Sequence, residues 1–133
     1  MSNLLIVKHL LMDEFELKLV LRSEVIGRFT VKRGFSPRVF SVLSNVSSKV
    51  GVVSISDNYV CINFGLKIGI EKTVSSFSKG DVCYSPYLQG LVFFTSASSE
   101  CSFLKATLIG RMLTPVDGLK SLKEGDVVSI IRV

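Results

Sequence analysis

The sequence lacks the residue patterns on which most catalytic sites depend. It contains a single histidine, His9, which lies outside the periodic apolar segments. Because a serine or cysteine nucleophile usually needs a base such as histidine, we do not expect triad hydrolysis. Acidic pairs stand close together at Asp13 with Glu14 and at Glu124 with Asp126. Both pairs precede predicted strands, where turn chemistry explains them, so we expect no metal site and no cofactor. The G-x-x-x-x-G-K-[ST] motif of a phosphate-binding loop does not occur either.

Cysteine is scarce and widely spaced. The chain has three cysteines, Cys61, Cys83 and Cys101, and no C-x-x-C pair. An odd number without that spacing argues against a disulfide framework and against a zinc site. Two of the three fall in apolar strand patterns. We therefore predict reduced, mostly buried thiols in a cytoplasmic protein.

Long apolar runs are missing although the composition is apolar. The hydrophobic fraction is 47% and the mean hydropathy +0.47. No apolar run reaches the roughly 18 residues that a transmembrane helix needs, so we expect no membrane span. The first residues, MSNLLIVKHLLM, resemble a signal peptide, but Lys8 and His9 interrupt the apolar run and no basic segment precedes it. We predict an extension over residues 1–12, either an extra strand or a short helix, and one domain over residues 13–133.

Acidic residues are rare in one stretch of the chain. The net charge is +5, and between Arg22 and Lys49 six basic residues face Glu24 alone. Such a bias favours acidic partners or nucleic acid. The aromatic and glycine patterns of common nucleic-acid modules are missing, however. We expect a solvated basic face, and nucleic-acid binding stays as an alternative.

Apolar residues that recur at every second position predict a mainly β fold. In EFELKLVL (Glu14–Leu21) the apolar residues face one way and the charged residues the other, which is typical of a half-buried strand. A hairpin joins this segment to residues 25–31, with Gly27 as a bulge. The remaining predicted strands cover residues 49–56, 59–64, 81–85, 91–95, 106–112 and 126–133. The total is about eight strands.

One segment changes to a helical period. In FSPRVFSVLSNV, Ser36 suits the N-cap and Pro37 suits the first helical position. One face of this helix is predicted to carry Val39, Val42, Leu43 and Val46. A second, shorter helical turn is expected within residues 114–122.

Two Gly-Asp pairs open predicted strands, at Asp81 and at Asp126. If the two turns met in a cleft, the carboxylates could do acid–base chemistry. The simpler interpretation is that each carboxylate accepts hydrogen bonds from backbone N–H groups of its own turn.

Aromatic residues gather in two strand regions and the connection between them. Because adjacent strand residues face opposite sides, one of Phe93 and Phe94 must lie on the outer face. An outward aromatic beside Tyr59 or Tyr84 would line an apolar groove. The alternative is that the predicted helix covers these residues.

The motifs in order, KGDVCYSP, GLVFFTS, ATLIGRM, VDGL and LKEGDVV, resemble the small archaeal and bacterial cyclophilin-like proteins. The resemblance covers about residues 14–133, and FSPRVFSVLSNV is similar to the first cyclophilin helix. It implies a closed β-barrel with one or two short helices. Cyclophilins themselves are peptidyl-prolyl isomerases, so the resemblance allows their site to be compared with this chain. In that site an arginine weakens the amide resonance of the X–Pro bond, and an apolar and aromatic pocket holds the proline ring.

Compared with the isomerase site, this chain has a similar apolar pocket residue but lacks the polar groups. Phe94 is similar to the pocket phenylalanine, but Val92 replaces a glutamine and the arginine position falls near Ser54. The chain has no tryptophan, and no Arg or Lys occurs from Val50 to Leu66. The resemblance therefore implies a binding module for an extended peptide or a small apolar molecule, with little isomerase activity. A weak isomerase is the alternative, and a homodimer is compatible with the apolar composition. The predicted groove consists of Tyr59, Phe64, Tyr84 and Phe94.

Overall fold

The computed structural model describes residues 13–69, 72–98 and 104–133. The predicted N-terminal extension, His9 and Cys101 lie outside these residues. The described elements are β1 (Glu14–Leu21), β2 (Glu24–Lys32), α2 (Pro37–Ser44), β3 (Ser48–Ile55), β4 (Tyr59–Asn63), β5 (Asp81–Ser85), β6 (Gly90–Phe94), β7 (Thr107–Arg111), the 3-10 helix η2 (Val116–Ser121) and β8 (Val127–Arg132).

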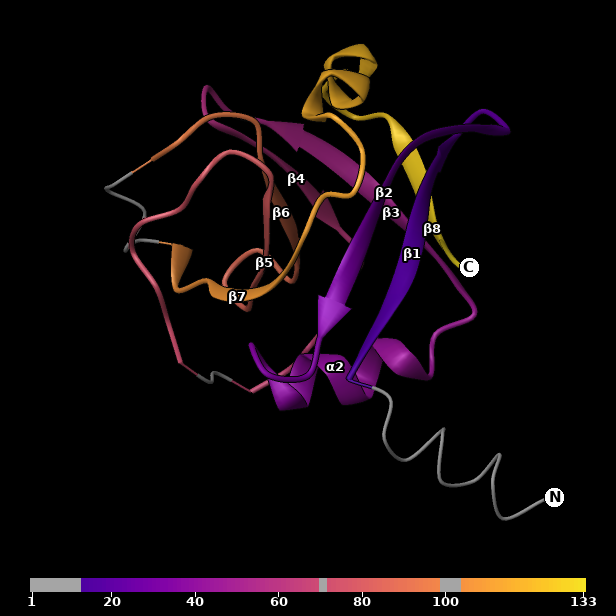
Figure 1. The fold of residues 1–133 in the computed structure, drawn as a ribbon. Coiled ribbons are helices and arrows are strands. Elements are labelled where there is room, and N and C mark those ends of the chain that lie inside the picture. The colour runs from indigo at the N-terminus through magenta and orange to yellow at the C-terminus, as the bar shows by residue number, and fades with distance from the viewer. Residues whose placement is uncertain (1–12, 70–71, 99–103) are drawn as a thin grey trace, which may run out of the picture.

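The eight strands form one antiparallel sheet in the order β2-β1-β8-β3-β4-β6-β5-β7. The sheet curls until its two edge strands, β2 and β7, meet at the bridge between Phe29 and Met112. The backbone N–H of Leu113 also donates to the carbonyl of Arg28 at 2.9 Å. The backbones come so close that a side chain at Gly110 would collide with the Thr30 carbonyl. The prediction of a mainly β barrel with about eight strands and two short helices is confirmed (Figure 1).

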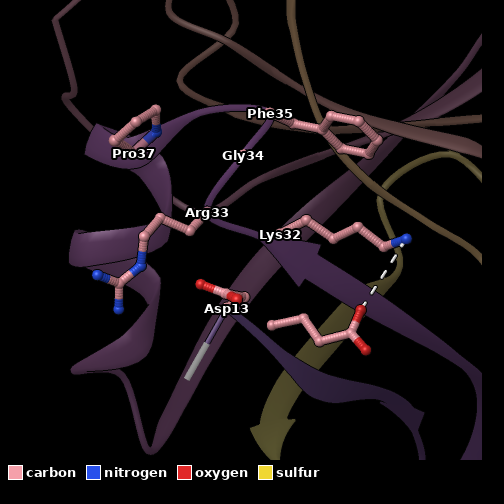
Figure 2. A pocket seen from close by; sticks show the side chains of 7 residues that line it. Asp13, Lys32, Arg33, Gly34, Phe35 and Pro37 are labelled. Carbon is pink, nitrogen blue, oxygen red and sulfur yellow. Dashed lines mark ion pairs between the residues drawn. The ribbon is translucent and has the colours of Figure 1, made fainter. Parts of the chain in front are cut away.

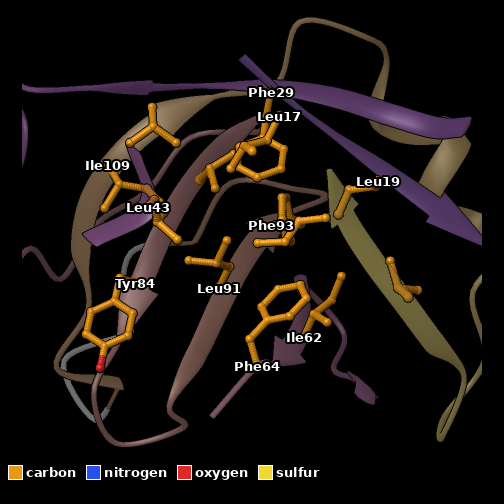
Figure 3. Packing of buried hydrophobic residues seen from close by; sticks show 14 of the residues in the cluster. Leu17, Leu19, Phe29, Leu43, Ile62, Phe64, Tyr84, Leu91, Phe93 and Ile109 are labelled. Carbon is orange, nitrogen blue, oxygen red and sulfur yellow. The ribbon is translucent and has the colours of Figure 1, made fainter. Parts of the chain in front are cut away.

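The barrel interior is filled by the apolar face of the alternating strands. On β1, Phe15, Leu17, Leu19 and Leu21 are buried, as the sequence pattern predicts. Figure 3 shows interior side chains that come from several strands, such as Leu17 on β1 and Phe93 on β6, and one, Leu43, from α2. Each buried aliphatic or aromatic side chain of this kind contributes roughly 1.5–3 kcal/mol by its removal from water.

Helix α2 contributes to the same interior. Its start follows the prediction, with Pro37 in the first turn after Ser36, although the Ser36 side chain makes no cap hydrogen bond. The buried helix residues are Val39, Phe40 and Leu43. Val42 was predicted on the buried stripe but is 40% exposed, because Phe40 turns toward Phe15 and packs edge-on against it at 5.1 Å. Which helix residues are buried therefore depends on the contact with β1, and the helical period of the sequence does not contain that information.

A second apolar cluster lies on the outer side of the barrel wall. This outer cluster consists of Cys61, Phe77, Cys83, Val92, Phe94, Leu104 and Ala106. Loop residues cover it: the N–H of Val74 donates to the Ala106 carbonyl at 2.9 Å, and the N–H of Phe77 to the Ser98 carbonyl at 2.7 Å. Strand β6 is therefore buried on both faces, as a strand covered on both sides should be.

Both Gly-Asp turns use their carboxylates as the sequence suggests. Asp81 accepts a hydrogen bond from the N–H of Ser78 at 2.8 Å, and Asp126 accepts one from the N–H of Lys123 at 2.9 Å. The preceding glycines have positive φ, 91° at Gly80 and 86° at Gly125, a conformation that glycine adopts without strain. The turn interpretation of these two aspartates is confirmed.

Within the described residues, no helix has both the length and the apolar character required to cross a membrane.

Candidate functional site

The four aromatic residues predicted to share a groove belong to two separate clusters. Phe64 and Tyr84 lie in the barrel interior, 5% and 1% exposed. Phe94 belongs to the outer cluster, and the half-buried Tyr59 packs against that cluster. The barrel wall therefore separates the two pairs, and the four side chains do not form one surface.

The hydroxyl group of Tyr84 anchors a neighbouring segment of backbone. The hydroxyl donates to the Leu66 carbonyl at 2.7 Å and accepts from the N–H of Ile68 at 2.9 Å. These bonds satisfy a buried polar group and hold the irregular stretch after β4 against the barrel. Figure 3 shows the ring inside the core.

Phe94 is the outward member of the Phe93 and Phe94 pair. It faces Tyr59 across β4 and β6, with ring centroids 5.7 Å apart. Phe77 stacks on it at 4.4 Å with an interplanar angle of 16°, and Phe94 is 0% exposed. The cover over this aromatic pair is thus the loop that carries Phe77, whereas α2 packs on the interior cluster.

The outer row of side chains beside Phe94 carries no charge. Strand register places Ser54 opposite Cys61, Cys61 opposite Val92, and Val92 opposite Cys83. None of these four side chains, including Ser54, is basic. Burial raises the pKa of the Cys61 thiol from 9.0 to about 11, so the thiol is protonated at neutral pH and is a poor nucleophile. This row offers apolar contact and no group for acid–base or covalent chemistry.

A pocket of about 380 Å³ opens at one end of the barrel, and we call it the barrel-end pocket. Its apolar lining comes from Ile55, Val60, Leu119 and Leu122, and its polar lining from Ser56, Asp57, Thr95, Ser96 and Lys120. Val60, Leu119 and Leu122 are at most 4% exposed and form the base, while Ile55 is 42% exposed. Such a combination, an apolar base with a few polar groups around it, is typical of small-ligand sites.

Hydrogen bonds fix the polar side of this pocket. The carbonyl of Asn58 accepts from the N–H of Thr95 at 2.9 Å, and the amide oxygen of Asn58 accepts from the Ser96 hydroxyl at 2.8 Å. Across the strand, the N–H of Ile55 donates to the carboxylate of Glu124 at 2.7 Å. The turn between β3 and β4 is therefore tied to both neighbours, and the pocket is preformed.

Sequence reasoning missed the barrel-end pocket. Ile55 ends one hairpin strand, whereas Leu119 and Leu122 come from η2 and the residue after it. The short apolar spacing after Pro115 signalled a helical turn, but nothing in the sequence places that turn beside the β3–β4 hairpin.

A second hollow, of about 620 Å³, lies where β1 begins and α2 starts. Figure 2 shows Phe35, Pro37 and Arg33 around it, with the Nζ of Lys32 3.9 Å from the carboxylate of Glu14. Asp13, the first described residue, is part of its wall. The hollow therefore lies beside the first residues that the structure describes.

Several residues of the basic stretch have acidic partners. Arg22 lies 3.5 Å from Asp126, and Arg28 lies 3.6 Å from Glu16. Together with the Lys32 pair, these contacts neutralise part of the positive charge between Arg22 and Lys49. Within the described ranges, no group of three or more Cys, His, Asp or Glu residues could hold a metal ion.

Comparison with solved structures identifies a similar fold. The chain is similar to the solution structure of the hypothetical protein AF2241 from Archaeoglobus fulgidus, with a TM-score of 0.70 and 15% sequence identity. The match covers 90% of this chain and 95% of that chain. At this identity the likeness concerns the fold alone. No protein-family model matches the chain, and no curated protein matches its sequence.

Proposed function

We propose that this protein is a small binding module that takes an apolar side chain of an extended peptide, or a small apolar molecule of similar size, into the barrel-end pocket. The observation that carries the proposal is this preformed pocket of about 380 Å³, within the roughly 300–1,000 Å³ of ligand sites. The aliphatic base supplies apolar contact, and the hydroxyls of Ser56 and Thr95 supply hydrogen bonds that orient the ligand.

The proposal includes kinship with cyclophilin-like barrels but not efficient isomerase activity. The kinship is supported by the order of the strand motifs and by the nearly closed barrel of eight strands. Isomerase chemistry of that type needs a cation at the twisted amide, and Ser54 and Val92 offer none. With a proline-containing peptide, exchange NMR should give the uncatalysed rate, which takes tens of seconds or longer.

The buried cysteines Cys61 and Cys83 suit a reducing compartment, so we place this function in the cytoplasm. The groove was predicted from Tyr59, Phe64, Tyr84 and Phe94. Its part around Tyr59 and Phe94 stays a prediction, since a ligand would reach Phe94 only after the Phe77 loop moved. Nucleic-acid binding gains no support from the ion pairs of Arg22 and Arg28.

The test is an amide-shift titration of isotope-labelled protein with capped Ala-Leu-Ala and Ala-Pro-Ala peptides and with small aliphatic alcohols. We expect saturable shifts at Ser56, Thr95 and Ser96. The variant Ile55→Lys places a charge at the pocket mouth and should weaken binding at least tenfold, because burying an unpaired charge beside a ligand is costly.

Val52→Lys is the matched control. Val52 lies on the same strand and is 51% exposed, but it does not line the pocket. This variant should bind as the unchanged chain does. If no probe moves the pocket amides at millimolar concentration, or if both lysine variants weaken binding equally, the proposal is wrong.

A further inference from the structure

The barrel-end pocket carries an uncompensated negative charge, although the net charge of the chain is +5. Two charged residues belong to its lining, Asp57 and Lys120. The Nζ of Lys120 lies 3.3 Å from a carboxylate oxygen of Asp117, so its positive charge is already paired. Among the residues that the structure describes, no basic side chain lies within ion-pair distance of the exposed Asp57. The charge in the lining that is still free to attract a ligand is therefore that of Asp57.

A neighbouring carboxylate adds to this charge. Glu124 accepts the hydrogen bond from the N–H of Ile55 at 2.7 Å, and Ile55 lines the pocket. Lys123, which follows the last lining residue in the chain, is exposed and is not part of the lining. Carboxylates outnumber ammonium groups in the lining and its immediate neighbours: they belong to Asp57, Asp117 and Glu124, against Lys120 and Lys123. The surroundings of the pocket therefore favour a cationic ligand over an anionic one.

The backbone around Asp57 is fixed. Asp57 lies in the turn between β3 and β4, where the N–H of Ser56 donates to the carbonyl of Tyr59 at 2.9 Å. The next residue, Asn58, accepts from the N–H of Thr95 at 2.9 Å. A turn that is already ordered loses little freedom when a ligand binds. The apolar base beside it also lowers the local dielectric, which strengthens the attraction between opposite charges.

We propose that the barrel-end pocket selects ligands that carry a primary ammonium group beside a branched aliphatic body, as does the free amino terminus of a peptide that begins with leucine. The aliphatic body lies on the apolar base, and the ammonium group pairs with Asp57. An ammonium group also donates three hydrogen bonds, and the hydroxyl groups of the lining residues Ser56 and Thr95 are acceptors. This inference rests on the proposed function, because it specifies the charge of the same ligand.

A carboxylate ligand fits the pocket less well. Lys120 is the only basic residue of the lining, and it is already paired with Asp117. A carboxylate bound to Lys120 would compete with that ion pair and would bring a further negative charge into a pocket that Asp57 also lines. Like charges at such short range repel each other. Ligand charge therefore separates the two possibilities experimentally.

The first experiment compares three small probes with similar aliphatic bodies: isoamylamine, isoamyl alcohol and isovalerate. Each is titrated into the full chain at about pH 6.5, where the amine is protonated and the acid is ionised, and the amide shifts of Ser56 and Thr95 give the dissociation constants. We expect isoamylamine to bind about fivefold more tightly than isoamyl alcohol, as an ion pair at the upper end of the exposed range does. Isovalerate should bind most weakly. Added salt should reduce the preference for the amine.

Two variants of equal charge test the role of Asp57. Asp57→Asn should bring the ratio of the amine and alcohol affinities close to one, and asparagine suits the same turn. The matched control is Asp13→Asn, which removes the same charge beside α2, at the other end of the barrel. This control should keep the ratio of the unchanged chain. A ratio that survives Asp57→Asn, or that falls equally in both variants, would overturn the proposal.

A pair of dipeptides identifies the source of the ammonium group. Leu-Ala amide with a free amino terminus should bind about fivefold more tightly than its acetylated form. A preference for isoamylamine without a preference between the dipeptides supports the proposal with a small amine as the ligand. Equal affinity of the three small probes, or tightest binding of isovalerate, would overturn the inference and leave the proposed function intact. If no probe shifts the pocket amides, the proposed function fails and the inference fails with it.

Discussion

The barrel interior and the outer cluster are equally buried but differently enclosed. Phe93 and Phe94 are neighbours on β6, and each is 0% exposed. Phe93 packs edge-on against Phe29 at 5.1 Å inside a wall of hydrogen-bonded strands. Phe94 lies under Phe77, which belongs to a loop. Because a loop opens at lower free energy than a strand in the centre of a sheet, equal burial does not mean equal resistance to opening.

The way in which each cluster is enclosed decides which site a ligand can reach. The outer cluster contains Phe94, one of the residues predicted to line a groove, and the side chain of Phe77 stacks on it. The barrel-end pocket, by contrast, is open in the structure and bounded by fixed backbone. The barrel-end pocket is therefore our candidate site. Ligand access to Phe94 would show how firmly the Phe77 loop is held.

The largest expected effect is a difference between two adjacent alanine variants. Phe93→Ala should lower the free energy of unfolding by about 3–5 kcal/mol, because the surrounding strands cannot collapse into the cavity. Phe94→Ala should cost less, about 2–3 kcal/mol, since the Phe77 loop can move inward. Urea denaturation of both variants measures this difference. Equal losses, or a larger loss for Phe94→Ala, would contradict the distinction between the two clusters.

The second prediction removes the cover. Phe77→Ala should cost about 1–3 kcal/mol and should speed amide exchange at Val74 and Phe77, while the barrel strands stay protected. Proline-containing peptides should then shift the amides of Tyr59 and Phe94, which they leave unmoved in the unchanged chain.

Tyr87→Ala is the control for this variant. Tyr87 is an aromatic residue that is 77% exposed, and its removal should change stability by no more than about 0.5 kcal/mol. If Phe77→Ala gives no access to Tyr59 and Phe94, the predicted groove does not exist even beneath the loop.

The smallest expected effect is a dependence of stability on alkaline pH. Burial raises the pKa of Cys61 from 9.0 to about 11, so the folded protein keeps a proton that the unfolded chain releases. This contribution is complete below about pH 9 and is lost as the pH rises through about 11. Between pH 9 and pH 11 the free energy of unfolding, measured by urea denaturation, should fall more steeply with pH for the unchanged chain than for Cys61→Ala. Identical slopes would mean that water reaches the thiol through the loop cover.

Local pattern was sufficient to predict most elements. The alternation of EFELKLVL gave the bounds of β1, and Ser36 with Pro37 marked the start of α2. Both Gly-Asp turns follow from residue chemistry within four positions of the chain. Partners distant in sequence decided the rest. Val42 is exposed because Phe40 packs against Phe15 in its place. Tyr84 stays in the interior because its hydroxyl group forms hydrogen bonds with the backbone of Leu66 and Ile68.

The sequence by itself determined that the chain forms about eight half-buried strands with their turns, because side-chain periodicity and turn residues act over a few neighbouring positions. Tertiary structure alone decided which of Phe93 and Phe94 faces the interior, what covers the other, and that Ile55 meets Leu119 and Leu122 in a pocket. Those outcomes depend on the register of the strands and on loops that contact the sheet from distant parts of the chain. A local sequence pattern does not predict the position of such loops.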